Sequence, residues 1–390
     1  MKSEPRQTSW HRCAAWTFLI LIFLVINADV IRRPLSHTTM RTYRFASTQW
    51  WAGQDPYTYD NHSGFLYFPQ AAVIFTPFNV LPFYLGEILW RVATFGLFAY
   101  ALVRLTECFL SRDASSPGKK FLILSLLAVP SSLASLRNAQ FDLPLASLIV
   151  LTAMEVVRNR WNAATLWLSL AIALKPLAIV PLLLFGALYW KLIPRLIVGL
   201  LVVIAIPFLH WNPAFVAHEY VRCFETLVWA AKANEARYSD LAALVSHVGI
   251  YPPDLLKTIV RIIFAVIYLG LGFGAVRRLN GINAAWTIGA LSADYLMLFN
   301  PRTETCSYVF LGPFVASLAL LYVQQPGRKW FAYLLGFAAL GLACDALPYI
   351  HNLTDRWFKP LIALLFLPTL IEFIFVRKTP EKENSSASHS

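Results

Sequence analysis

Long apolar segments recur along the whole chain, and they constrain its fold more than any other feature. A hydrophobic run of about 20 residues crosses a bilayer as a helix, so the pattern predicts an all-α, polytopic membrane protein with about 12 spans. Several runs are only 12–16 residues long, which predicts tilted or broken helices. The candidate spans are 14–31, 85–107, 121–136, 143–157, 163–174, 177–190, 196–210, 255–276, 282–299, 306–323, 330–344 and 359–376.

The charge content excludes most other classes of protein. Only 14% of the 390 residues are charged, while 58% are hydrophobic, and a soluble domain carries about 25% charged residues. A soluble enzyme and a disordered chain are therefore excluded. The net charge of +12 comes from basic residues scattered between apolar runs, not from a basic patch, so nucleic acid is not an expected partner.

The basic residues also predict the topology. They concentrate in alternate loops, as the positive-inside rule expects of cytoplasmic loops. Residues 1–13 are then a cytoplasmic N-terminus, 14–376 form one membrane domain, and the polar tail 377–390 is cytoplasmic and disordered. The prediction is a multi-pass protein of the plasma (inner) membrane, with both termini inside.

On this topology, two long segments face outward, at about 32–84 and 211–254. The first is a large extracytoplasmic loop, in which the aromatic stretch 40–52 suits a helix in the membrane interface. Segment 65–83 is apolar but contains three prolines. We expect it to be a re-entrant or interfacial element, although a full crossing would make thirteen spans and invert the charge pattern.

Ionisable residues at the rim of the membrane are costly and are functional candidates by default. Those of this chain gather on the predicted outer side, which indicates a polar outer cavity, although each alone is as compatible with a structural ion pair. The residues are Asp29, Arg137, Asp142, Lys175, Asp294, Arg302 and Glu304, with Gln140 between two of them. Glu87, Arg91 and Glu107 are better interpreted as structural partners between helices or at the interface.

The sequence supports neither a metal site nor a bound cofactor. No histidine pair has HxxxH or HExxH spacing, the five cysteines are scattered without a CxxC motif, and there is no Walker motif or GxGxxG. We therefore expect no metal and no cofactor.

The order of several short motifs resembles glycosyltransferase family 87, whose members are polytopic enzymes of the GT-C superfamily. These motifs are WAGQDPY, FLYFPQAAVIFTPFNVLP, NAQFDLPLASLIVL, ALKPLAIVPLLL, ARYSDLAALV and NPRTETCSYVFLGP. The similarity extends from about residue 10 to 376. Known members transfer mannose from polyprenyl-phosphate-mannose to form alpha-1,2 linkages, so the resemblance implies a polyprenyl-phosphate-sugar donor, a glycan or glycolipid acceptor and contact with membrane lipids.

The family motifs map onto this chain with some substitutions. Gly-x-x-Pro-Tyr corresponds to Gly53, Pro56 and Tyr57, and the Lys-Pro hairpin to Lys175 and Pro176. The family motif Tyr-x-Pro-Leu is matched by Tyr67 and Pro69, with Gln70 in place of Leu. The motif Gly-Gln-x-Asn corresponds to Ala139, Gln140 and Asp142. A late Pro…His-Tyr element corresponds to Pro301 and Tyr308, with Ser307 in place of His.

The main departure concerns the catalytic acid. The family has Asp four residues before a Tyr in the first outer loop. Tyr43 fits that Tyr, but the position four residues earlier is Thr39. The preferred substitute is Asp29, because catalytic acids of GT-C enzymes commonly lie just past the first helix; Asp55 is the second candidate and Glu304 the third.

The chemistry of a polyprenyl-phosphate-sugar donor suggests roles for the other candidate residues. A phosphate at the membrane rim needs cations, and Arg137, Lys175 and Arg302 are the candidate donor phosphate ligands. An inverting transfer of a hexose needs one general base. The resemblance implies substrate binding by Tyr43, Tyr57, Gln140, Asp142 and Tyr308.

Two other functions remain open from the sequence. A lipid-linked-sugar flippase or transporter would need polar residues at the bilayer midplane, often within inverted repeats, and neither feature is found. A catalytically inactive relative of the GT-C enzymes remains compatible with Thr39.

Overall fold

The computed structural model describes residues 6–33, 38–57, 64–111, 116–231, 238–346, 348–354 and 356–376. The described part of the chain is all-helical and contains no strand, as the sequence predicts. Its longer helices in chain order are α1 (Arg6–Arg32), α2 (Met40–Trp51), α3 (Pro69–Asn79), α4 (Phe83–Leu105), α5 (Pro117–Ala128), α6 (Leu133–Arg137), α7 (Asp142–Val157), α8 (Trp161–Leu174), α9 (Ile179–Leu188), α10 (Ile193–Ala205), α11 (Pro213–Ala231), α12 (Leu241–His247), α13 (Asp254–Arg278), α14 (Gly281–Phe299), α15 (Gly312–Val323), α16 (Lys329–Gly341), α17 (Pro348–Thr354) and α18 (Phe358–Phe375).

Helix α7 is the centre of the molecule. Every residue from Asp142 to Val156 is buried, and the helix packs against α4, α8 and α14. The peripheral helices differ sharply: only 17% of the most apolar stretch of α13 is buried, against 89% within Thr305–Val323. The exposed apolar faces of α13, α1 and α10 require a lipid environment, because water would leave a large hydrophobic surface uncovered.

Seven helical segments of the described chain are long and apolar enough to cross a membrane. Each of the twelve predicted segments coincides with a helix or a run of helices, but α8 and α9, for example, are 14 and 10 residues long. The structure therefore shows a multi-pass membrane protein, while the number of twelve spans stays a prediction. Helix α1 begins at Arg6, earlier than the predicted span. The predicted tail at 377–390 lies outside the described residues.

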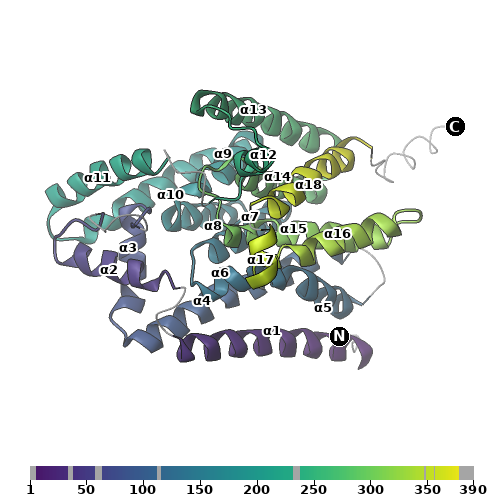
Figure 1. Cartoon of the computed structure of the whole chain (residues 1–390), viewed down its shortest axis with the longest axis horizontal. Helices are drawn as coiled ribbons and strands as arrows, with labels where there is room; N and C mark the ends of the chain where they lie inside the picture. The colour runs from purple at the N-terminus through teal and green to yellow at the C-terminus, as the bar shows by residue number, and fades with distance from the viewer. Residues whose placement is uncertain are drawn as a thin grey trace.

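The segment predicted as the first outer loop carries helices. Helices α2 and α3 pack against each other and lie with α11 at one end of the molecule, whereas the start of α1 and the end of α18 lie toward the other end (Figure 1). A helix forms in the predicted stretch, as α2, with Trp50 buried and Trp51 exposed, while its location in the membrane interface stays a prediction. Helix α3 has 11 residues, about half the length that a crossing requires.

Two backbone breaks place polar side chains beside α7. Pro176 disfavours a helical conformation at the residue before it, and Lys175 is extended, with φ −149° and ψ 131°. The other break is the turn between α6 and α7, where Ala139 has φ 56°. The first break frees Lys175 from the helix, and the second precedes Asp142, which contacts Lys175.

Candidate active site

The turn between α6 and α7, residues 136–142, supplies three of the predicted site residues. Arg137 ends α6, Asp142 begins α7, and Gln140 lies between them. Because Ala139 reverses the chain, Gln140 and Asp142 extend toward the η7 segment (Thr305–Phe310) that precedes α15. The turn thus joins the central helix to the NPRTE motif.

Six side chains form a central polar cluster, which we define as Gln140, Asp142, Lys175, Glu304, Cys306 and Ser307. Asp142 forms an ion pair with Lys175 and accepts a hydrogen bond of 2.7 Å from the hydroxyl of Ser307. Gln140 donates to a carboxylate oxygen of Glu304 over 2.7 Å, and the thiol of Cys306 donates to Gln140 over 2.7 Å. The structure therefore brings together four predicted site residues from three separate sequence motifs.

The cluster has a buried side and an accessible side. Asp142, Cys306 and Ser307 are buried, Lys175 and Gln140 are partly exposed, and Glu304 is exposed. A ligand at the exposed side would meet a carboxylate, an amide and an ammonium group whose positions are fixed by buried neighbours. This arrangement suits recognition of a polar group such as a sugar or a phosphate.

Asp29 and Arg137 form a second pair beside the same turn. The Nε atom of Arg137 lies 2.7 Å from Oδ2 of Asp29, and both side chains are about one-third exposed, at 27% and 35%. Asp29 belongs to the last turns of α1, so this contact joins the first helix to the end of α6. The pair places a carboxylate and a guanidinium together at a position that solvent reaches.

Buried aromatic rings pack against the turn between α6 and α7. The hydroxyls of Tyr43 and Tyr67 lie 3.2 Å apart, and the backbone N–H of Phe141 donates to the Tyr43 hydroxyl over 3.3 Å. The Tyr43 and Phe141 ring centroids are 4.4 Å apart. Burial raises the pKa of Tyr43 and of Tyr67, so both phenols stay neutral. Since Tyr43 is 1% exposed, its direct contact with a substrate stays a prediction.

Arg302 precedes the η7 segment, and Tyr308 lies within it. Arg302 donates from Nε to the hydroxyl of Tyr238 over 2.7 Å, while its Nη1 is buried without a hydrogen-bond partner among the described residues. Tyr308 is fully buried and donates to the carbonyl of Ser239 over 2.7 Å. Tyr308 therefore supports the fold in this structure, and its predicted contact with a substrate is untested.

The surroundings of Asp294 differ from the predicted ones. The sequence analysis grouped Asp294 with Arg302 and Glu304 at the outer rim. In the structure Asp294 is completely buried and accepts a hydrogen bond from Tyr268 of α13. Asp294 lies near the end of α14, as predicted, but on the face that packs against α13, so it does not line an accessible cavity in this structure. Its depth in the membrane stays a prediction.

Asp55 and Tyr57 belong to a different group of contacts. One Asp55 oxygen accepts from the backbone N–H of Tyr57 over 2.7 Å, and the other lies 3.1 Å from Nε of Arg222 on α11. The Tyr57 hydroxyl donates to the Tyr67 carbonyl over 2.9 Å. Asp55 therefore connects the segment predicted as the first outer loop to α11, and the catalytic role predicted for it is untested.

The sequence analysis missed the buried carboxyl group of Glu219, which lies beside Asp55. Burial raises the pKa of Glu219, and the charge of Asp55 raises it further, although a hydrogen bond from His218 opposes both effects. Its Oε2 is buried without a hydrogen-bond partner among the described residues. The available signal was an acidic residue at helical spacing from Val216 and Cys223, on a face of α11 that is otherwise apolar.

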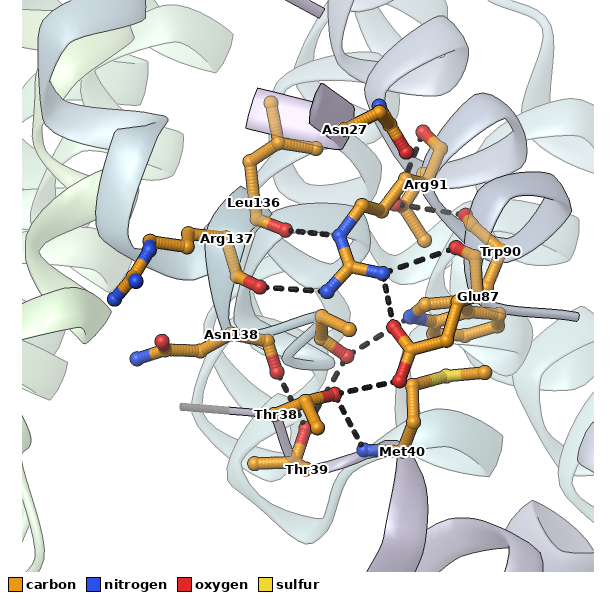
Figure 2. Close-up of polar contacts among 12 residues, drawn as sticks. Asn27, Thr38, Thr39, Met40, Glu87, Trp90, Arg91, Leu136, Arg137 and Asn138 are labelled. Atoms are coloured by element: carbon orange, nitrogen blue, oxygen red, sulfur yellow. Dashed lines mark hydrogen bonds and ion pairs between the residues drawn. The ribbon is translucent and has the colours of Figure 1, made fainter. Parts of the chain in front are cut away.

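The predicted structural role of Glu87 and Arg91 is confirmed. The two side chains form a buried ion pair on α4, and Arg91 also donates to backbone carbonyls of the turn between α6 and α7 (Figure 2). Thr39, where the family motif has Asp, lies at the same turn. Its hydroxyl donates to the carbonyl of Asn138 over 2.9 Å.

Comparison with known proteins identifies the family. A search of curated proteins finds no match. The family model for glycosyltransferase family 87 matches residues 65–301, which is more than half of the chain and includes the turn, Lys175 and α11. The family implies a membrane glycosyltransferase, in agreement with the multi-pass fold. By this match, the chain belongs to glycosyltransferase family 87.

Proposed function

We propose that this glycosyltransferase transfers a hexose, mannose being the first candidate, from a polyprenyl-phosphate donor to an extracytoplasmic glycan or glycolipid. The observation that carries the proposal is the convergence at one turn of the Asp29–Arg137 pair and the Gln140 and Asp142 contacts. A donor with an anionic head and an apolar tail suits polar side chains held within an apolar helical bundle. No residue of the central polar cluster belongs to a nucleotide-binding motif.

Three cationic side chains are candidate ligands of the donor phosphate, and they differ in whether their donor atoms already have a partner. Arg137 and Lys175 each have a carboxylate partner, whereas Arg302 retains a donor atom without a partner among the described residues. A phosphate can replace a carboxylate on an Arg side chain, because the guanidinium binds either group in the same geometry. We therefore assign Arg302 as the first ligand of the phosphate. Arg137 and Lys175 neutralise the rest of the negative charge of the phosphate.

The base of the reaction is proposed to be Asp29. The acceptor hydroxyl attacks the anomeric carbon, the bond from that carbon to the phosphate oxygen breaks, and the hydroxyl proton passes to the carboxylate. While Arg137 binds Asp29, the carboxylate is a weak base. A donor phosphate that draws Arg137 away would raise the basicity of Asp29 when the donor is in place. Attack opposite the leaving phosphate inverts the anomeric configuration.

The proposed orientation follows from the charges. The basic loops and the two ends of the membrane domain are placed in the cytoplasm, so α2, α3 and α11 face outward. The start of α1 and the end of α18 lie toward the same end of the molecule, as this orientation requires (Figure 1). We propose the plasma membrane as its location, with the reaction on the extracytoplasmic side.

The proposal is tested on the whole protein in nanodiscs. Polyprenyl-phosphate-mannose, and separately the glucose and arabinose forms, are supplied with a mixed pool of membrane glycolipids, and free polyprenyl phosphate is measured by mass spectrometry. Release from one donor, together with a heavier glycolipid, supports the proposal and identifies the sugar. In sealed proteoliposomes, movement of intact donor between leaflets without release would instead indicate a transporter. Donor binding with neither release nor movement would indicate an inactive relative.

A further inference from the structure

Four consecutive carbonyl groups of the turn between α6 and α7 accept hydrogen bonds from outside the turn. Arg91 donates from Nε to Leu136 over 3.0 Å and from Nη2 to Arg137 over 2.6 Å. The backbone N–H and hydroxyl of Thr39 each donate to Asn138 over 2.9 Å. Trp90 donates to Ala139 over 2.9 Å. Figure 2 shows these groups around the turn.

The backbone and the side chains of the turn make different contacts. Its backbone is fixed by α4 and the start of α2, whereas its side chains extend to Asp29 from Arg137, to Glu304 from Gln140 and to Lys175 from Asp142. Arg91 is fully buried, and its ion pair with Glu87 fixes the guanidinium. A small rotation of the turn would move all three side chains together.

We propose that Thr39 and Arg91 are positioning residues for the transfer reaction: they hold the turn that presents Arg137 and Gln140 to the substrates and Asp142 to Lys175. The expected change in donor KM rests on the proposed function. The expected change in the stability of the turn does not depend on it. Thr39 then acts through backbone hydrogen bonds and not as a base.

The chemistry around Thr39 supports this assignment. Its hydroxyl faces the carbonyl oxygens of Asn138 and Ala139, at 2.9 and 3.3 Å. A carboxylate at this position has no hydrogen to donate, so it would repel both oxygens. In this chain, therefore, an aspartate at position 39 would disturb the turn.

The test compares single substitutions that keep or remove the hydroxyl. Thr39→Ser keeps the donor, Thr39→Val removes it with little change of shape, and Thr39→Asp replaces it with a repelling group. Arg91→Lys keeps the charge but loses the fork that reaches two carbonyls. Thr48→Val, on the exposed face of α2, is the matched control because its hydroxyl does not contact the turn.

The first readout is hydrogen–deuterium exchange of residues 136–141, measured without substrates. Several of their amides bond to nearby carbonyls, for example from Gln140 to Ser135 of α6 over 3.0 Å, and the amide of Phe141 bonds to the Tyr43 hydroxyl. Thr39→Val, Thr39→Asp and Arg91→Lys should speed exchange there but not within α7, whereas Thr39→Ser and Thr48→Val should match the wild type. Unchanged exchange in Thr39→Val and Arg91→Lys would overturn the inference, whether or not the protein is a transferase.

The second readout separates positioning from general damage. We expect Thr39→Val to raise the donor KM about threefold to tenfold, the factor that corresponds to one lost hydrogen bond, while the acceptor KM stays constant. Thr39→Asp should be more impaired than Thr39→Val. Greater activity in Thr39→Asp than in the wild type would overturn the assignment. If even the wild type lacks transfer, the proposed function fails, and the exchange data alone decide the role of Thr39 and Arg91.

Discussion

The guanidinium of Arg137 lies 2.7 Å from the carboxylate of Asp29, although 108 residues separate them in the chain. The contact joins the end of the first membrane helix to the turn that supplies Gln140 and Asp142. A carboxylate and a guanidinium are therefore present together at the place where the donor phosphate and the acceptor hydroxyl must meet in the proposed reaction.

Asp29→Asn should abolish transfer while the protein stays folded. The amide keeps the size of the side chain but does not accept a proton, and removing a general base lowers kcat by about 10²- to 10⁴-fold. Polyprenyl phosphate release is measured together with thermal unfolding in detergent. Asp55→Asn and Glu304→Gln are assayed in parallel. Full activity of Asp29→Asn, with loss in one of the other two, would transfer the role of base to that residue.

Lys175 should contribute to donor binding, but a single substitution is ambiguous. Asp142 is 1% exposed, and removal of its partner leaves a buried charge that destabilises a protein by about 3–5 kcal/mol. The double variant Lys175→Met/Asp142→Asn avoids that charge. It should unfold near the wild-type temperature and still show a donor KM at least about tenfold higher, as expected for a lost charged hydrogen bond.

The matched control for this double variant is Lys191→Met. Lys191 is exposed and lies over the ring of Trp161, away from the contacts of the central polar cluster. Its donor KM should equal that of the wild type. A normal donor KM in a well-folded Lys175→Met/Asp142→Asn protein would remove Lys175 from the phosphate site.

The helical class and the grouping of polar residues were predictable because each follows from local sequence. Apolar runs predict helices, and Pro176 predicts the break that exposes Lys175. The contacts between Gln140 and Glu304 were not predictable, because they depend on how α7 packs against the η7 segment. The burial of Asp294 was not predictable for the same reason: its distance from the end of α14 was known, but the direction of its side chain was not.

Glu219 should make the stability of the protein depend on pH. Its pKa is raised in the folded state, mainly by burial, so the folded protein binds more protons than the unfolded chain above the ordinary pKa of Glu. Stability should therefore fall as pH rises through that interval. Glu219→Gln, which cannot ionise, should reduce this slope in thermal unfolding between about pH 5 and pH 8.

The control for Glu219 is Glu225→Gln on the same helix. Glu225 is exposed and pairs with Arg222, so its substitution should leave the slope unchanged. His218 also contacts Glu219, and His218→Asn is measured to separate its titration. A wild-type slope in Glu219→Gln would show that the buried carboxyl does not control the pH response.

Ala139 provides a test of backbone conformation at the candidate active site. Its φ of 56° is unfavourable for residues with a β-carbon and costs about 1–2 kcal/mol. Ala139→Gly should therefore retain activity and change the free energy of unfolding by less than about 1 kcal/mol, because the relief of strain offsets the added freedom of the unfolded chain. Ala139→Val should lose both stability and donor binding, since a branched side chain is strained at positive φ.

Asn159 offers a matched control for Ala139 because its φ is also 56° and its side chain is exposed, at the turn between α7 and α8. Asn159→Gly and Asn159→Val should change stability in the same order, without any effect on the donor KM. Activity and thermal unfolding are measured for all four variants. If Ala139→Gly impaired donor use as much as Ala139→Val, the methyl group of Ala139 would be the determinant, and the conformation of the turn would not explain its role.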